Sequence, residues 1–301
     1  MDAATMNDLM TNKRGQNRHN RNARRHIGDL LVILVVFAAL FWLLAKAQGV
    51  SYKWDWPAVG GYLIAPDGDG GFSAGLMLEG LLTSLRLLVW GGIIAMIIGL
   101  AAALAALSRV AGLRWLALVY VESLRNLPPI VFMFIFYFFI SAHVLGGGFS
   151  QSLPDDGGLL WRVLVGEPRL AENFIGGALC LGVFEGAFFA EVFRAGIAGV
   201  SRGQWDGAHS VGLGRWKTLR LIILPQAARK IAAPAAGQTV LLIKDSAILS
   251  VISVEELAFS AQETAVSTNQ VFEVWIIASL FYFALCWPLL RAAAALEKRA
   301  R

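Results

Sequence analysis

Residues 87–108 read LLVWGGIIAMIIGLAAALAALS, a run of 22 residues without a charge. A helix needs about 20 mostly apolar residues to cross the hydrocarbon core of a bilayer. The stretch therefore predicts a membrane-spanning helix, extending upstream to about Leu78. Of the 301 residues, 57% are hydrophobic and 16% are charged, against about 25% charged in an ordinary soluble domain. This composition excludes a soluble globular protein, and it excludes disorder for most of the chain.

Five further apolar runs flank this one. We expect an all-α, polytopic transmembrane bundle of six helices, at about 30–47, 78–108, 127–145, 174–200, 231–254 and 274–290. Ala45-Lys46-Ala47 resembles a signal-peptide cleavage site, but the long basic tail ahead of it favours a retained helix. The expected parts of the chain are a basic, disordered cytoplasmic tail at 1–28, an extra N-terminal span at 29–48, an extracytoplasmic linker at 49–75 and the main transmembrane domain at 76–296.

The basic residues predict the orientation of the helices, because cytoplasmic connections carry an excess of Lys and Arg. The N-terminal tail, the connections at 109–125 and 201–230, and the C-terminal tail hold 19 of the 26 Lys and Arg residues. The alternate connections hold four basic and twelve acidic residues. Both termini are therefore expected in the cytoplasm. The net charge of +5 reflects this partition and does not indicate nucleic-acid binding.

The connection at 203–225 has the most distinctive pattern. It predicts a short helix, a turn at Gly212, a second amphipathic helix and a stop at Pro225. Trp205, Ala208 and Val211 form one apolar stripe at helical spacing. Physical reasoning leaves two interpretations open: a helix on the membrane surface, or an element that docks on a soluble partner.

The spacing of this segment resembles the EAA loop of the inner-membrane permeases of binding-protein-dependent ABC importers. That loop reads E-A-A, three residues, G, nine residues and I-x-L-P. The matching residues here are Asp206, Gly207, Ala208, Gly212, Ile222, Leu224 and Pro225. Asp206 and Gly207 depart from the family's Glu and Ala, and glycine is a poorer helix former than alanine by about 1 kcal/mol.

Three more segments resemble the polar-amino-acid branch of that family. ESLRNLPP at 122–129 is similar to E-x-x-R-N-x-P, AEVFRAGI at 190–197 to A-E-x-x-R-G-G-I, and KDSAILSVI at 244–252 to K-D-T-S-L-x-S-V-I. The resemblance covers residues 76–296, which contain five of the six predicted spans. The first span is then an added element of the N-terminal region.

The resemblance implies a permease subunit of an ATP-driven importer in the bacterial inner membrane. Its 203–225 loop would dock in a groove on a cytoplasmic ATPase subunit. The other implied partners are a soluble substrate-binding protein, a second permease copy or a related permease, and the lipid bilayer. ATP would be bound by the partner, and no cofactor by this chain.

Charged residues inside predicted spans are costly and usually face a partner or a cavity. The candidates for a translocation path or substrate site are Glu185, Glu191, Arg194, Lys244, Asp245 and Ser246. Glu191 and Arg194 can pair within one helix, so they are either a structural pair or substrate contacts. Asp245 and Ser246 line either a polar path or a buried network between helices. Paired opposite charges suit an amino acid, which carries both an ammonium and a carboxylate group.

The sequence motifs of nucleotide binding and of metal binding are absent. No G-x-x-x-x-G-K-[ST] loop, H-E-x-x-H or C-x-x-C motif occurs in the chain. We therefore expect no catalytic residue and no metal site, and a transport subunit in place of an enzyme. The alternatives are an ion-coupled secondary transporter of a small polar solute, with Asp245 or Glu185 as its proton site, and a membrane scaffold protein.

Overall fold

The computed structural model describes residues 34–35, 37–39, 41–42, 52–66, 71–141, 143 and 158–300. The predicted tail at 1–28 lies outside the described residues. In the predicted first span, the seven described residues are helical, and the rest of that span also lies outside them. The chain divides into Met1–Trp54 and Asp55–Arg301, and all elements below belong to the second unit.

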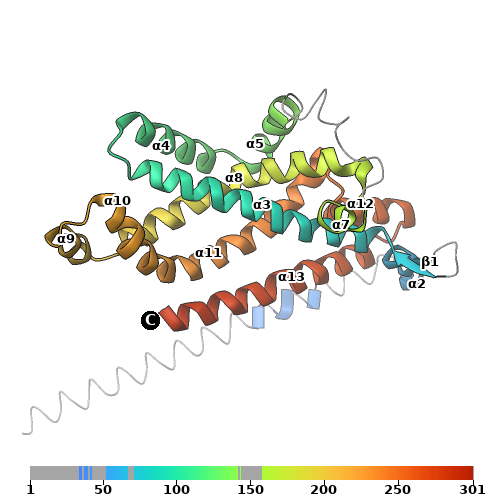
Figure 1. Ribbon diagram of the computed structural model, residues 1–301. Coiled ribbons are helices and arrows are strands. Elements are labelled where there is room, and N and C mark those ends of the chain that lie inside the picture. The colour runs from blue at the N-terminus through green and yellow to red at the C-terminus, as the bar shows by residue number, and fades with distance from the viewer. Residues whose placement is uncertain are drawn as a thin grey trace, which may run out of the picture. The chain divides into compact units, whose positions relative to one another are not determined.

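Four helical runs in this unit are long and apolar enough to cross a membrane: Leu76–Ala106, Pro168–Ala198, Arg215–Ile252 and Val271–Lys298. They contain the helices α3 (Leu76–Ala106), α8 (Ala171–Ala198), α11 (Leu224–Ser246) and α13 (Val271–Ala300) (Figure 1). A fifth candidate is the bent pair Ala111–Asn126 and Pro129–Phe139, which meet at 116°. The all-α membrane bundle is confirmed, with up to five spans among the described residues.

The bent pair differs from the predicted span at 127–145. Most of the expected cytoplasmic connection is itself a helix, α4 (Ala111–Asn126), which ends at the extended residue Leu127. A residue before proline avoids the helical region, so Pro128 forces this break. Helix α5 (Pro129–Ile135) then starts with a proline in its first turn and continues as the π-helical η1 (Phe136–Ser141).

The predicted stop at Pro225 is wrong. Helix α10 (Arg215–Thr218), π-helical η4 (Leu219–Ile223), α11 and the 3₁₀ segment η5 (Ala247–Ile252) form one helical run. Pro225 lies in the first turn of α11. Proline has no N–H group to donate to the preceding turn, and the wider π-helical turn before Pro225 accommodates the lack of this hydrogen bond. The run therefore connects the 203–225 loop directly to the membrane span.

The centre of the fold is the crossing of α3 and α8, which make the most extensive contacts of any two described elements. Glycine allows the two backbones to approach, as in many membrane helix pairs. A Cβ atom at Gly99 would lie 2.7 Å from Phe189 Cβ and 2.9 Å from the Gly186 carbonyl oxygen. Around this crossing, large apolar side chains such as Phe184 and Leu181 are fully buried.

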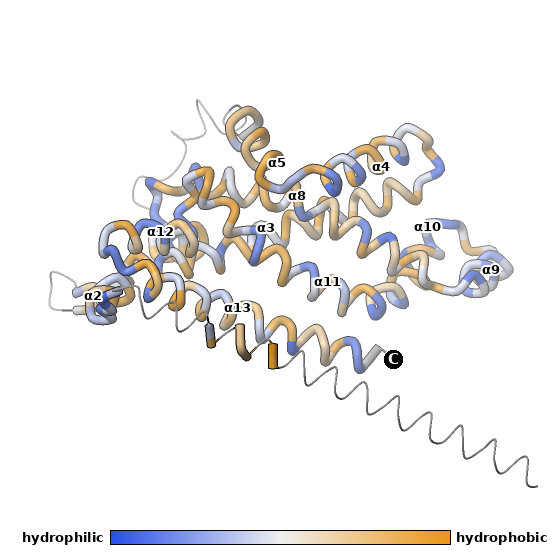
Figure 2. Tube along the Cα trace, turned by 180° about the vertical axis from the view of Figure 1, so that it is seen from behind, coloured by the Kyte–Doolittle hydropathy of each residue, from blue (hydrophilic) through white to orange (hydrophobic). Residues whose placement is uncertain are grey.

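Short elements cover one end of the bundle. They are α2 (Trp56–Leu63), the antiparallel strands β1 (Ile64–Pro66) and β2 (Phe72–Ala74), α7 (Leu159–Leu164), the 3₁₀ helix η3 (Pro168–Leu170) and α12 (Leu257–Thr268). The predicted linker at 49–75 thus includes a helix and a hairpin. Helix α9 (Arg202–Ser210), α10 and the C-terminal end of α13 lie at the opposite end (Figure 1). Figure 2 shows hydrophilic residues concentrated around α9 and around α2.

The carboxylate of Glu256 links the helices α3, α12 and α13 by hydrogen bonds. Glu256 is fully buried, caps the N-terminus of α12 and accepts hydrogen bonds from the N–H groups of Ala258 and Phe259 at 2.7 and 3.1 Å. Tyr282 of α13 donates its hydroxyl to the same carboxylate at 2.7 Å, and Ser84 of α3 donates at 3.1 Å. Sequence reasoning did not identify this residue.

We expect Glu256→Ala to lower the free energy of unfolding by about 2–3 kcal/mol, because it leaves the buried hydroxyls of Ser84 and Tyr282 without their acceptor. Burial raises the pKa of Glu256, although the bonds from Tyr282 and the backbone oppose this. Its stabilising contribution is therefore complete below the ordinary glutamate pKa and declines as pH rises through the raised value. Unfolding in mixed micelles across a pH series measures both effects.

The exposed Glu263 on the same helix α12 provides the control. Glu263→Ala should leave stability within about 0.5 kcal/mol of the parent. Equal losses for Glu256→Ala and Glu263→Ala would contradict the proposed tie between the three helices.

Candidate functional site

The loop after α8 forms a short helix held against the end of the bundle. Ala208 on α9 is 3% exposed, and Trp205 packs beside Ile223 and Val200. Val211 is 74% exposed, so the predicted stripe stops at Ala208, because α9 ends one residue before Val211. Gly212 has φ +77°, which confirms the predicted turn, since this backbone region favours glycine.

Polar contacts fix the loop to the helices around it. Gln226 of α11 donates to Gln204 of α9 at 3.0 Å. Arg215 donates to the carbonyl oxygen of Leu107, just beyond α3, at 2.7 Å. Among the matched loop residues, Asp206 differs: it is exposed, and none of the described hydrogen bonds or ion pairs uses its carboxylate. Its side chain is therefore available to a partner.

The other matched residues divide between α9 and the start of α11. Gly207 is exposed and has open space around its Cα. Ile222 and Leu224 are half-buried and pack against Ile223 and Ala227 in the same apolar cluster. The sequence-matched segment thus contains an exposed tip at α9 and a buried base at the start of α11.

A buried polar cluster lies where α8 faces α11. Glu185 of α8 is fully buried, and Gln238 of α11 donates to its Oε2 at 2.7 Å. The carboxyl group of Asp245 lies near that of Glu185, close enough for the two charges to interact. Glu185 Oε1 has no hydrogen-bond partner among the described residues, so this buried oxygen can accept a hydrogen bond from a ligand.

The remaining predicted path residues lie elsewhere. Arg194 donates to both oxygens of Glu191 at 3.0 and 2.7 Å, and Arg125 of α4 lies 3.9 Å from Glu191. This group links α4 to α8 on an accessible surface. Lys244 is exposed. Ser246 is 1% exposed and donates to the Ile243 carbonyl at 2.8 Å. The structure therefore brings Glu185 near Asp245. Glu191 and Arg194 pair with each other, and Ser246 bonds within its own helix.

Residues 95–301, more than half of the chain, match the family described as binding-protein-dependent transport system inner membrane component. The chain belongs to this family. This inner membrane component is 34% identical over 203 residues to the probable glutamine ABC transporter permease GlnM of Bacillus subtilis, with 67% of this chain and 83% of the relative covered. It is 29% identical over 264 residues to the L-cystine transport system permease TcyB of the same organism, with 85% and 95% covered.

Its fold is also that of a solved ABC transporter. The crystal structure of an amino acid ABC transporter with histidines matches with a TM-score of 0.60 and 27% identity. The match covers 74% of this inner membrane component and 94% of that chain. The resemblance deduced from the loop and the three short segments is thereby confirmed at the level of family and fold.

Proposed function

We propose that the chain is the permease subunit of an ATP-driven importer of polar amino acids. The observation that carries this is the continuous helical run from Arg215 to Ile252, which joins the α9 loop to Gln238 and Asp245. The relatives named as glutamine and cystine permeases support the substrate class. No separate observation favours an ion-coupled carrier.

The helical run is the mechanical link in this proposal. A cytoplasmic ATPase pair that closes on ATP displaces α9. The bonds from Gln226 to Gln204 and from Arg215 to the Leu107 carbonyl carry that displacement into α11 and the end of α3. Gln238 and Asp245 on α11 then move relative to Glu185 on α8. ATP and the amino acid each bind one of two global states better, which is the condition for driven transport.

The partners follow from the same arrangement. ATP is bound by the cytoplasmic ATPase, and a soluble binding protein delivers the amino acid to the end that carries α2, α7 and α12. A second permease chain completes the path. The excess of Lys and Arg in alternate connections supports cytoplasmic termini in the bacterial inner membrane, with α9 on the cytoplasmic side.

The Glu185–Asp245 cluster is the proposed polar point on the path, because an ammonium group can donate to the unpartnered Oε1 of Glu185 beside Asp245. We expect Asp245→Asn to lower the uptake rate at least about tenfold, since the loss of one charged partner costs 1.5–3 kcal/mol. Uptake of labelled amino acids by the reconstituted complex measures this. Lys244→Gln, one residue away and exposed, is the control and should retain uptake. Unchanged uptake by Asp245→Asn would remove this residue from the path.

Purification of the tagged chain from its native membrane tests the assignment as a whole. An ATPase should co-purify in stoichiometric amount, and uptake into proteoliposomes should require ATP. Uptake driven by a proton gradient without ATP would instead favour an ion-coupled carrier and would overturn the proposal.

A further inference from the structure

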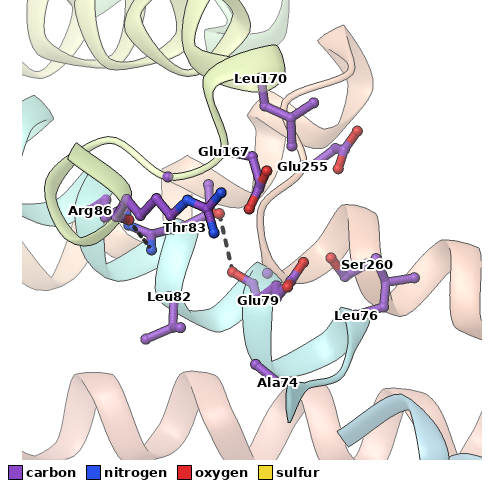
Figure 3. A pocket seen from close by; sticks show the side chains of 13 residues that line it. Ala74, Leu76, Glu79, Leu82, Thr83, Arg86, Glu167, Leu170, Glu255 and Ser260 are labelled. Carbon is purple, nitrogen blue, oxygen red and sulfur yellow. Dashed lines mark hydrogen bonds between the residues drawn. The ribbon is translucent and has the colours of Figure 1, made fainter. Parts of the chain in front are cut away.

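A small polar cavity lies at the opposite end of the bundle from α9. Its volume is about 130 Å³, and its walls come from β2, α3, the segment at 162–170, Glu255, and Ser260 of α12. Figure 3 shows the carboxylates of Glu79, Glu167 and Glu255 around a common space, with the Ser260 side chain beside them. None of these residues belongs to the α9 loop or to the Glu185–Asp245 cluster.

The hydroxyl of Ser260 has no partner. Ser260 is 1% exposed, lines the cavity, and its Oγ makes no hydrogen bond with any described residue. Gly80 faces it: a Cβ atom there would lie 2.4 Å from Ser260 Oγ, so only glycine leaves room for the hydroxyl. A buried hydroxyl without a partner costs free energy, and a hydrogen-bonding ligand in the cavity would recover it.

Three carboxylates (Glu79, Glu167 and Glu255) and two guanidinium groups (Arg86 and Arg162) line the cavity, so its lining carries one net negative charge. In the described parts of the chain, the ion pairs within 4 Å involve Glu191, and none involves Glu79, Glu167 or Glu255. Burial raises the pKa of Glu255, and the neighbouring carboxylates of Glu263 and Glu79 raise it further, against the opposing effect of Arg169. A positive charge bound here would relieve this repulsion.

Two of the neighbouring side chains donate hydrogen bonds to backbone carbonyl oxygens. The Arg86 guanidinium donates through Nε to the Val163 carbonyl at 3.0 Å and through Nη2 to the Arg162 carbonyl at 2.9 Å. The Thr83 hydroxyl donates to the Glu79 carbonyl at 3.1 Å. The acceptors of the cavity, Ser260 Oγ and the carboxylates of Glu79 and Glu255, therefore remain for a ligand.

We propose that this cavity binds the primary ammonium group of an amino acid, as an entry site on the face opposite the ATPase loop. The inference rests on the proposed import function. An ammonium group has three N–H donors, which match Ser260 Oγ, Glu255 and Glu79. Among the described residues, no cluster of three His, Cys, Asp or Glu side chains could hold a metal ion. Arg162, which also lines the cavity, offers a donor to the α-carboxylate, and the amino acid side chain stays at the mouth.

The test measures binding of L-glutamine to the full chain in lipid nanodiscs by ligand-observed NMR. We expect L-glutamine to bind, ethylammonium to compete with it, and N-acetyl-L-glutamine, which lacks the ammonium, to bind at least about tenfold more weakly. Glu255→Gln should weaken binding about tenfold and Ser260→Ala about threefold. Glu122→Gln, an exposed residue of α4 outside the cavity lining, is the control and should bind as the parent does.

Three binding results would contradict the proposed ammonium site. Equal binding of N-acetyl-L-glutamine would overturn the proposal, as would parent-like binding by both Glu255→Gln and Ser260→Ala. If Glu185→Gln abolishes binding while Glu255→Gln does not, the ligand occupies the other cluster and the proposal is wrong. Uptake is measured separately on the assembled complex. If the complex takes up the amino acid at the parental rate and requires ATP, but no binding occurs at the cavity, the import function stands and this site is rejected.

Discussion

The Asp206→Lys variant is expected to insert and fold normally but to lose ATP-dependent uptake, with a decrease of at least about 100-fold. Asp206 is exposed on α9, and its carboxylate takes part in none of the described hydrogen bonds or ion pairs. The substitution therefore disturbs no internal contact. At a partner surface, a reversed charge is costly, because like charges brought together cost several kcal/mol and the former partner loses its ion pair.

Two measurements on the purified Asp206→Lys variant test this expectation. Co-purification reports whether the ATPase remains bound, and proteoliposome uptake reports the transport rate. Glu263→Lys makes the same change of charge on the exposed surface of α12, at the opposite end of the bundle from α9, and should retain the bound ATPase. Normal ATPase binding and uptake by Asp206→Lys would exclude a docking role for this residue.

The Gly99→Ala variant is expected to lose about 3 kcal/mol of stability, at the upper end of the cost of overpacking. The added methyl would lie 2.7 Å from Phe189 Cβ, 2.9 Å from the Gly186 oxygen and 3.0 Å from the Ala190 nitrogen. Two of these atoms are backbone, which cannot rotate away. The methyl fits only if α3 and α8 move apart, and their separation would open the central apolar cluster.

Gly92 on the same helix provides a matched control. It is also buried, but a Cβ atom there meets its first neighbour, Leu242 Cδ1, at 4.0 Å. Gly92→Ala should be neutral or stabilising by up to about 1 kcal/mol, because alanine is the better helix former. Unfolding in mixed micelles compares the two variants directly. Equal stability of both would show that the α3–α8 crossing tolerates a wider separation.

The close packing of α8 has a signal in the sequence. Gly182 and Gly186 form a G-x-x-x-G pattern within the apolar run of α8, which is a known signal for close helix packing. In contrast, the sequence did not predict α4 as part of a membrane span. Arg114, Glu122 and Arg125 interrupt its apolar residues, and the break at Pro128 shortens each half below the length of a membrane helix.

The sequence by itself determined the membrane class, the position of most spans and the spacing of the α9 loop. These depend on local properties: the length of apolar runs, the distribution of Lys and Arg, and the glycine that permits a turn. Only the tertiary structure decided that Gln238 bonds to Glu185 near Asp245, and that Ser260, Glu79 and Glu255 line one cavity. Such meetings depend on how far each helix is rotated about its axis. That rotation is fixed by packing between segments distant in sequence, such as the approach of α3 to α8 at Gly99.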